Sequence, residues 1–373
     1  MNANKAKWVR LGDYIEQCDE RNAEGIYTIE DAMGMTITKE IIPTKANLQD
    51  NDLYKFLVVN PKEFVYNPRT HGKKIGLGFN NTEKPFIISW NNVAFRVKDT
   101  ALLLPDYLYI IICREEWDRN ACFRSWGSST EVFSWNEFSL MEIPLPSIDI
   151  QQELVDTYNG LKSLAEQNEA LIEPLSKACE AFVSDCQSKY PQEELGKYIE
   201  VFDKRNTDGN DYLFYGINKD KTFMPTVADT NNLDSSKYKV VNKGDFVFSG
   251  MQTGRDICIR IALYNDIQPI IISPAYTTFK IKDETLIIPQ YLFLQFKRFE
   301  MDRYGWFLSD GSIRSNLEWE RFCNIRIPLP SIEVQQSIVN LYNCMEEAKR
   351  IASEAREQLE TLCPALIQRA ANS

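Results

Sequence analysis

The chain carries the stretch Ile-Pro-Leu-Pro-Ser-Ile at residues 143–148 and repeats it unchanged at residues 327–332. In both places the serine is a good helix N-cap, and two positions later Asp149 or Glu333 puts an acidic group into the first helical turn. The stretch therefore predicts the point where a globular segment ends and a helix begins, and it does so twice.

The same offset in residue number, 184, relates many other positions along the chain, Trp135 and Trp319 among them. One stretch slips, because Phe64–Asn67 align with Phe246–Ser249 at an offset of 182. We therefore expect a small length difference near residues 78–85 and a compensating one before residue 58. A fixed repeat period indicates repeated structural units, and the chain is interpreted as two copies of one module.

Each module is expected to begin with a mixed α/β globule. Runs of β-branched and aromatic residues between turn residues indicate strands, and a proline at a first helical position indicates a helix start. The predicted fold class is α+β, with two tandem mixed α/β domains at residues 1–147 and 188–330 and long helices at residues 148–187 and 331–373. The expected strands are Tyr54–Val59, Phe86–Trp90, Val93–Val97, Val240–Val241, Asp245–Phe248 and Thr277–Ile281, and the expected helices are Pro105–Arg114 and Pro289–Arg298.

Both long helices carry apolar residues at the alternating spacing of three and four that is typical of a coiled coil, so we expect them to pack on each other. Pro174 predicts a bend or a break near Glu173. Asn168 either fixes the register as a buried residue or lies at the solvent edge, and the sequence leaves both open. The seam predicted for the second helix is Leu341, Met345, Ala348, Ala352, Ala355, Leu359, Leu362 and Leu366. The seam predicted for the first helix is Thr157, Leu161, Leu164, Asn168, Leu171, Leu175, Ala178 and Phe182.

The composition excludes several classes of protein. With 42 basic and 53 acidic residues, the net charge is −11 and the pI is about 4.9, which argues against a uniformly basic nucleic-acid binder. His71 is the single histidine, so a histidine-rich metal site is excluded. Nine cysteines without a C-x-x-C pair indicate reduced thiols in a cytosolic protein. No secretory leader and no run that could span a membrane is visible, and we expect a soluble, cytoplasmic protein.

Two similar globules on paired helices form a caliper, which suits an extended and periodic ligand. Double-stranded DNA is such a ligand, because dimeric DNA readers place two reading heads a fixed number of helical turns apart. The two heads differ in sequence, so the DNA site that they read would be split and asymmetric.

These features resemble the specificity subunits of Type I restriction-modification systems (HsdS). The resemblance rests on the repeated Ile-Pro-Leu-Pro-Ser entry into a helix that opens with Gln-Gln, and on Phe-Val-Tyr-Asn-Pro at residues 64–68. The Gly-Ser pairs at residues 127–128 and 311–312 also match the layout of that family. The resemblance covers essentially the whole chain.

The resemblance implies two target-recognition domains, each reading one half of a bipartite DNA sequence, and an antiparallel coiled coil whose length sets the gap between the halves. It implies two methyltransferase (modification) subunits that bind the helical region, joined by restriction/translocase subunits. Those partners would use S-adenosylmethionine, ATP and magnesium, while this chain would bind no cofactor and no metal. The implied methylation position is N6 of adenine.

The residues themselves argue against a catalytic site. An amino-methyltransferase needs an Asn/Asp-Pro-Pro-aromatic loop, and the nearest approaches, at residues 60–62 and 67–69, lack the second proline. No G-x-x-x-x-G-K-S/T phosphate loop is present either. The chain is therefore interpreted as a non-catalytic subunit.

Three pairs of loops are candidates for DNA contact, because the two copies agree in their framework and differ in these loops. Arginine can bond guanine, glutamine and asparagine can bond adenine, and small hydroxyl residues can approach phosphates. For any single residue, a solvated turn is an equally good interpretation. The candidates in the first copy are Arg69, His71, Lys73, Lys74, Asn91, Asn92, Arg124, Ser128, Ser129 and Thr130. Those in the second copy are Gln252, Thr253, Arg255, Arg260, Tyr276, Ser312, Arg314 and Ser315.

Several aromatic residues have other interpretations. Trp135 and Trp319 are predicted to lie in the core, and a core position is also favoured for Trp90. Tyr158 and Tyr342 are predicted to bind a methyltransferase subunit, with packing against the adjoining globule as the alternative. The paired glutamines at each helix start are expected to be exposed or to cap the helix.

Two alternatives to a Type I specificity subunit remain open: a recognition subunit of another DNA-modification system, and a protein-interaction scaffold without enzymatic activity. The distribution of charge is compatible with DNA binding. Residues 1–147 have a balance of −3 and residues 188–330 are neutral, whereas residues 148–187 alone contribute −6. We therefore expect weak DNA binding by the chain alone, with the phosphates neutralised largely by partner subunits.

Overall fold

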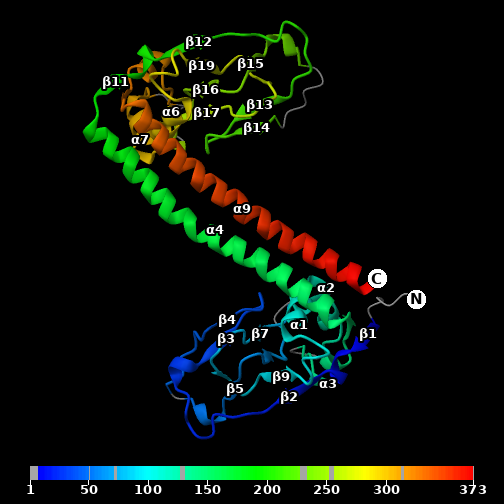
Figure 1. The fold of residues 1–373 in the computed structure, drawn as a ribbon. Helices are drawn as coiled ribbons and strands as arrows, with labels where there is room; N and C mark the ends of the chain where they lie inside the picture. The colour runs from blue at the N-terminus through cyan, green and yellow to red at the C-terminus, as the bar shows by residue number, and fades with distance from the viewer. Residues whose placement is uncertain are drawn as a thin grey trace. The chain divides into compact units, whose positions relative to one another are not determined.

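The computed structural model describes residues 7–49, 51–70, 74–126, 131–226, 233–251, 256–311 and 315–372. It divides into two compact units: unit 1 comprises residues 1–167 and 351–373, and unit 2 comprises residues 168–350. Each unit holds one globule and a part of each long helix (Figure 1). The division therefore cuts through both helices and does not coincide with the four segments that the sequence suggested.

The two copies contain the same kinds of element in nearly the same order. The first copy contains β1 (Lys7–Arg10), β2 (Ile15–Cys18), β3 (Met33–Met35), β4 (Ile41–Pro43), β5 (Leu57–Val59), β6 (Phe64–Tyr66), β7 (Leu77–Phe79), β8 (Phe86–Ile88), β9 (Val93–Val97), α1 (Pro105–Ile112), α2 (Glu115–Phe123), α3 (Trp135–Ser139), β10 (Glu142–Leu145) and α4 (Ile148–Lys189). The second copy contains β11 (Gln192–Glu194), β12 (Ile199–Phe202), β13 (Phe214–Ile217), β14 (Phe223–Pro225), β15 (Lys239–Val241), β16 (Phe246–Ser249), β17 (Arg260–Leu263), β18 (Ile270–Ile272), β19 (Thr277–Ile281), α6 (Pro289–Phe296), α7 (Phe299–Leu308), α8 (Trp319–Cys323), β20 (Arg326–Pro328) and α9 (Ile332–Asn372).

Each globule is built on a four-stranded antiparallel sheet, ordered β2-β9-β6-β7 in unit 1 and β12-β19-β16-β17 in unit 2. Successive side chains of a strand point to opposite faces of a sheet. Accordingly, Phe64 and Tyr66 of β6 pack with α1, α2 and α3, whereas Val65 packs against β5 and β8. Phe246 and Val247 of β16 repeat this alternation. Both faces of each sheet are covered, which explains why the inner strands β6 and β16 are buried along nearly their whole length.

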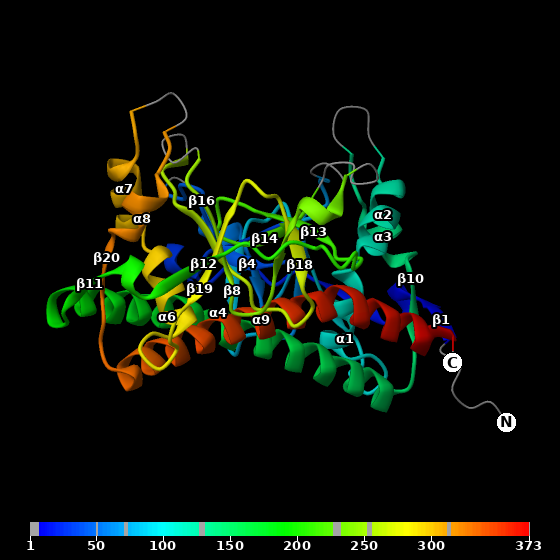
Figure 2. The same ribbon diagram turned by 90° about the horizontal axis from the view of Figure 1, so that it is seen from above.

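The second layer of strands differs between the copies. In unit 2 it is one sheet, ordered β14-β13-β18-β15, whereas in unit 1 it consists of two separate pairs, β3-β4 and β5-β8. The helices lie on the other side of the main sheet. In Figure 2, α2 and α3 lie side by side in unit 1, where the rings of Trp117 and Phe138 are 5.6 Å apart.

All eight predicted elements are present, and four of them are shorter than predicted, whereas β9 and β19 have the predicted bounds. The strand expected over Tyr54–Val59 covers only β5, because Asp52 accepts a hydrogen bond from the Tyr54 N–H and caps a 3-10 turn over Leu53–Lys55. Helices α1 and α6 begin at Pro105 and Pro289 as predicted and end two residues before the predicted ends. Trp135 and Trp319 pack against the cores of their units, as predicted.

The register of the paired strands shows where one copy has more residues than the other. Tyr66 pairs with Leu77 and Phe248 pairs with Ile261, so ten residues (67–76) lie between the paired residues in the first copy and twelve (249–260) in the second. The predicted position near residues 78–85 is therefore wrong, because the extra residues lie in the loop between β6 and β7. The compensating difference precedes β3, as predicted.

Helix α4 runs without interruption for 42 residues with Pro174 inside it, so of the predicted bend or break near Glu173 the break is wrong. A proline removes one backbone donor and leaves the carbonyl four residues earlier without its partner. Here Pro174 and Ala170 are both exposed, and water can bond the Ala170 carbonyl. The helix therefore tolerates the proline.

Within each unit the segments of α4 and α9 lie side by side and run in opposite directions, as expected for an antiparallel coiled coil (Figure 1). The predicted α9 seam is confirmed where its side chains are described, because Met345, Ala348, Ala352 and Ala355 are buried. Leu341 and Leu359 are half-buried. The side chains of Leu362 and Leu366 lie outside the described residues.

The seam predicted for α4 is wrong at three of its eight positions. Leu164, Leu171 and Phe182 are exposed, whereas their neighbours Ala165 and Val183 are buried. The prediction transferred the α9 positions through the offset of 184, but α4 takes a step of four residues after Leu161 where α9 takes a step of three after Met345. The other five positions are half-buried, and they are Thr157, Leu161, Asn168, Leu175 and Ala178.

Candidate nucleic-acid interface

Two of the candidate loops in unit 1 are joined by backbone hydrogen bonds. The Phe133 N–H donates to the Pro68 carbonyl at 2.7 Å, and the Thr70 N–H donates to the Glu131 carbonyl at 3.1 Å. Trp126 and Val132 exchange backbone bonds of 3.1 and 2.9 Å across the second loop. The loop after β6 and the loop after α2 therefore form one surface, although Thr70 and Glu131 are far apart in the sequence.

Unit 2 repeats this connection. The Leu317 N–H donates to the Gly250 carbonyl at 2.8 Å, and the Asp310 N–H donates to the Asn316 carbonyl at 3.0 Å. A side chain at position 250 would meet the Leu317 carbonyl oxygen at 2.1 Å, so glycine is required for this close approach. The framework of the two loops is thus the same in both copies.

The third candidate turn lies at the same end of the sheet. Val93, the first residue of β9, pairs with Tyr66, the last residue of β6, which places the turn over residues 89–92 beside the loop after β6. Trp90 on this turn is 60% exposed, so its favoured core position is wrong. Asn91 is exposed, whereas the amide of Asn92 donates to the Ser89 carbonyl at 2.9 Å.

The corresponding turn of unit 2 presents a different side chain. Thr277 of β19 pairs with Phe248 of β16, and Tyr276 precedes it. Tyr276 is half-buried against a small core cluster, and its carbonyl accepts a hydrogen bond of 2.7 Å from Lys239. Burial lowers the pKa of Lys239. Packing therefore holds Tyr276 in place and limits its reach toward DNA.

The basic candidates divide into two kinds. Arg69 and Lys74 are exposed, and neither is in an ion pair with another described residue. Arg124 instead pairs with Glu137 at 3.2 Å, and Arg260 pairs with Asp256. Arg69 and Lys74 are therefore better placed for DNA than Arg124 and Arg260, whose charges are already compensated.

The remaining candidates give little further geometry. Ser315 is half-buried and has a left-handed backbone with φ of 40°, a conformation that non-glycine residues rarely adopt. Ten predicted contacts lie outside the described residues: His71, Lys73, Ser128, Ser129, Thr130, Gln252, Thr253, Arg255, Ser312 and Arg314.

Sequence reasoning missed a pair of exposed aromatic residues beside these loops. Phe123 ends α2 and is 81% exposed, and Phe307, near the end of α7, is 78% exposed. The offset of 184 relates the two, so the duplication itself carried the signal. Trp126 on the following loop is also exposed in unit 1, where unit 2 has Asp310.

The tyrosines predicted to bind a partner pack within their own units. Tyr158 packs against the core of unit 1, and Tyr342 packs against the core of unit 2. Lys297 donates a hydrogen bond to the Tyr342 hydroxyl and lies 4.8 Å from the centre of its ring. These contacts support packing against the adjoining globule, which was the alternative interpretation.

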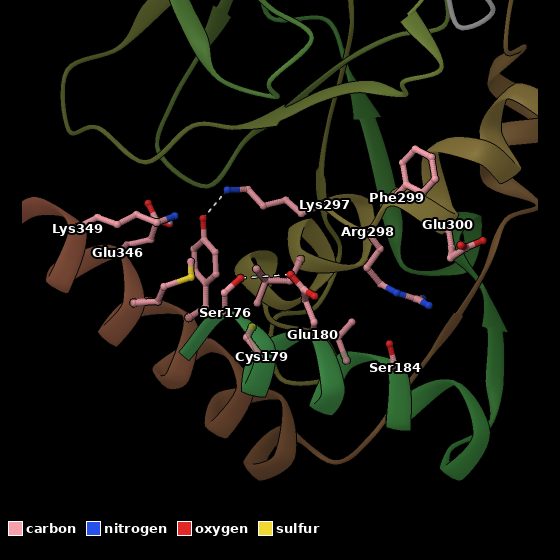
Figure 3. A pocket seen from close by; sticks show the side chains of 14 residues that line it. Ser176, Cys179, Glu180, Ser184, Lys297, Arg298, Phe299, Glu300, Glu346 and Lys349 are labelled. Carbon is pink, nitrogen blue, oxygen red and sulfur yellow. Dashed lines mark hydrogen bonds and ion pairs between the residues drawn. The ribbon is translucent and has the colours of Figure 1, made fainter. Parts of the chain in front are cut away.

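Tyr342 and Lys297 border a cavity of about 490 Å³ in unit 2, between α4, α9 and the start of α7 (Figure 3). Burial lowers the pKa of Lys297 and raises that of Tyr342. The acidic residues have partners: Glu180 accepts from Ser176 at 3.2 Å, and Glu346 pairs with Lys349 at 2.9 Å. The cavity is a junction between helices and globule, at the opposite end of α7 from the candidate loops.

The described residues form neither a metal-binding cluster nor a membrane-spanning helix. No cluster of three or more histidine, cysteine, aspartate or glutamate side chains in this part of the chain could hold a metal ion. Among the described helices, none combines the length and the apolar character that a membrane crossing requires. The eight cysteines whose side chains are described are all unpaired.

The geometry defines a class of protein: a duplicated chain in which each α/β globule presents divergent loops on a common framework, with paired long helices. Residues 193–360 match the family model of the Type I restriction modification DNA specificity domain. The match covers most of the second copy, and the first copy repeats its elements at the same offset. Residues 193–360 are therefore similar to the DNA specificity domain of Type I restriction-modification systems.

One solved Type I specificity subunit shares the fold. The S subunit of a Type I restriction-modification system from M. genitalium is 13% identical, with a TM-score of 0.60 over 99% of this chain and 97% of that one. The HsdS subunit from Thermoanaerobacter tengcongensis is 17% identical, with a TM-score of 0.43 over 98% and 96% of the two chains. No curated protein sequence matches the chain.

Proposed function

We propose that the chain is the specificity subunit of a Type I restriction-modification complex, in which each globule reads one half of an asymmetric, bipartite DNA site. The contrast between framework and loops carries this proposal. The hydrogen bonds that join the loops recur in both copies, while the residues that they present differ, with Arg69 opposite Met251 and Trp126 opposite Asp310. Different side chains on one framework suit two different base sequences.

The long helices are proposed to dock two methyltransferase subunits and to set the gap between the half-sites. Leu171 and Phe182 support docking, because both are exposed and their spacing of 11 residues, about three turns, places them on one face of α4. Exposed apolar side chains on one face of a helix suit a protein partner. Restriction/translocase subunits would join this complex in the cytoplasm.

The chemistry is assigned to those partners. S-adenosylmethionine would serve the methyltransferase subunits, and ATP and magnesium would serve the restriction subunits. This chain is proposed to be non-catalytic, to hold none of these groups, and to direct methylation to N6 of adenine by choosing the site.

An exchange of heads tests the proposal. The wild-type chain, produced in cells with its methyltransferase subunit, should give a split methylated motif with adenine in both halves when genomic DNA is sequenced as single molecules. Replacing residues 1–147 by the head of another family member should change one half of the motif and leave the other half and the gap intact. The absence of a split motif, or a change in both halves, would contradict the proposal. Gel shifts of the assembled complex on DNA would separate it from a scaffold that binds only proteins.

A further inference from the structure

Each unit contains one ion pair that is more buried than any other ion pair in the described part of that unit. Lys39 Nζ lies 2.6 Å from Asp118, with side chains 3% and 7% exposed. Lys221 Nζ lies 2.7 Å from Asp302, with side chains 7% and 12% exposed. The lysines are related by the offset of 182 and the aspartates by the offset of 184, as are the elements that carry them. The pair is therefore one feature that both copies have kept.

Keeping this pair has a cost in both copies. Burying two charges loses their hydration, and a well-packed apolar pair is often at least as stable. Both lysines also lie at the tips of hairpins, β3–β4 and β13–β14, with left-handed backbones at φ of 67° and 61°. A contribution to stability alone does not explain why both copies contain a strained backbone and a buried ion pair at this place.

The pair holds the end of a candidate loop. In unit 1, Lys39 Nζ donates to the Ile75 carbonyl at 2.7 Å, and the Ile75 N–H donates to Asp118 at 3.3 Å. In unit 2, the Ile259 N–H donates to Asp302 at 2.9 Å. Ile75 and Ile259 close the loops after β6 and β16, in which the two copies differ in length and sequence. One buried group thus connects a hairpin, a helix and the end of a loop.

The same group is connected to the second candidate loop through its helix. Asp118 lies on α2, which leads into the loop after Phe123, and Asp302 lies on α7, which leads into the loop after Leu308. The two loops of each unit meet through backbone bonds, as described above. The ion pair therefore contacts the end of one loop and the helix that leads into the other loop. It is too deeply buried to contact a ligand itself.

We propose that Lys39–Asp118 and Lys221–Asp302 are positioning residues for base recognition, each pair fixing the two reading loops of its own head. This inference rests on the proposed function. The common anchor lets loop residues and loop length change while the loop ends stay in place. Each pair consequently governs the specificity for one half of the DNA site and leaves the other half unaffected.

The test uses the complete complex in cells, with the genomic DNA of the host as the probe and single-molecule sequencing of methylated adenines as the readout. The double substitution Lys39→Met with Asp118→Asn removes both charges and leaves no unpaired buried charge. In one half of the motif it should reduce discrimination between the recognised base and its alternatives by about tenfold, the scale of one bidentate base contact. Lys221→Met with Asp302→Asn should do the same in the other half.

A matched control removes an exposed ion pair from the same helix, Arg119→Met with Glu115→Gln, and should leave the motif unchanged. If the first double variant does not assemble, Lys221→Met with Asp302→Asn gives the same readout in the other half. A purely structural role would lower the amount of complex and methylation at all sites with the motif unchanged, and this result would overturn the inference. Loss of specificity in both halves together would also overturn it. A wild-type chain without a split motif would instead refute the proposed function.

Discussion

At the scale of single residues, the most constrained side chains are two glutamines at the helix starts. The Gln151 oxygen accepts from the Leu104 N–H, and its amide donates to the carbonyls of Leu102 and Pro146, each at 2.9 Å. Gln335 makes the same three bonds in unit 2. Both side chains are fully buried, so the expectation of exposed or capping glutamines is wrong for the first member of each pair.

Replacement of Gln151 by alanine should lower the free energy of unfolding by about 2–4 kcal/mol, because backbone groups of Leu102, Leu104 and Pro146 lose the hydrogen bonds that the buried amide supplies. Its neighbour Gln152 is exposed and bonds only Asp156, so Gln152→Ala should change stability by less than about 0.5 kcal/mol. Urea unfolding of both variants measures the difference. Equal effects of the two substitutions would contradict the assigned roles.

Cys113 and Lys297 occupy matching positions and should respond to alkaline pH in opposite directions. Burial raises the pKa of the Cys113 thiol to about 11, so the unfolded chain loses this proton first and stability falls as pH rises from 9 toward 11. Burial lowers the pKa of Lys297, so native Lys297 loses its proton first and stability rises as pH rises from that lowered pKa toward the ordinary value of 10.5.

Without the Cys113 thiol, in Cys113→Ala, the free energy of unfolding should no longer fall by up to about 1.4 kcal/mol per pH unit above pH 9. In Lys297→Met, the free energy of unfolding should no longer rise over the pH range given for Lys297. Urea unfolding of the wild-type chain and of each variant, at pH values between 8 and 11, gives the slopes. A wild-type slope in the Cys113→Ala chain, or slopes that change in the same direction in both variants, would show that the assignment is wrong.

At the scale of elements, the two long helices show how far heptad spacing can be used. The α9 seam was predictable because its small and apolar residues occupy one set of heptad positions, and neighbouring positions offer no alternative apolar set. On α4 both Leu164 and Ala165 could continue the pattern, and the offset of 184 from the α9 seam selected Leu164. The structure buries the alanine and exposes the leucine. Spacing alone could not decide this, because the choice depends on how closely the partner helix approaches.

Substitutions at these two neighbours test the seam. Ala165→Leu adds a larger side chain at a fully buried position and should cost about 1–3 kcal/mol through overpacking. Leu164→Ala should cost less than about 1 kcal/mol, because the leucine is already exposed. Thermal unfolding followed by circular dichroism ranks the two variants. A larger loss of stability in Leu164→Ala than in Ala165→Leu would indicate that Leu164 lies in the seam, as the sequence suggested.

At the scale of the whole molecule, local patterns account for the duplication, the helix starts and most of the strands. They also placed the candidate loops, which the structure brings to one end of each sheet. They could not show which charges are already compensated. Arg124 pairs with Glu137, and Lys39 pairs with a residue 79 positions away, because the fold brings those residues together. The sequence identifies loop residues as candidates for DNA contact. Only the contacts in the folded protein show which of these candidates are free to bind DNA.

The proposed role of the helices predicts the outcome of lengthening both by one heptad. Duplicating residues 172–178 of α4 and residues 345–351 of α9 keeps every seam residue in phase, because seven residues is the repeat of the coiled coil. Seven residues add about 10.5 Å of helix at about 1.5 Å each. That length equals about three base pairs at about 3.4 Å each.

The methylated motif of the lengthened chain should keep both half-sites and gain about three unspecified base pairs between them, measured by single-molecule sequencing of genomic DNA. Lengthening α4 alone is the control, since one helix then has an unmatched heptad, and it should reduce the amount of assembled complex. The recognition loops are unchanged in the doubly lengthened chain, so both half-sites should stay the same and only the gap between them should respond. An unchanged gap would mean that something other than the helices sets the distance between the half-sites.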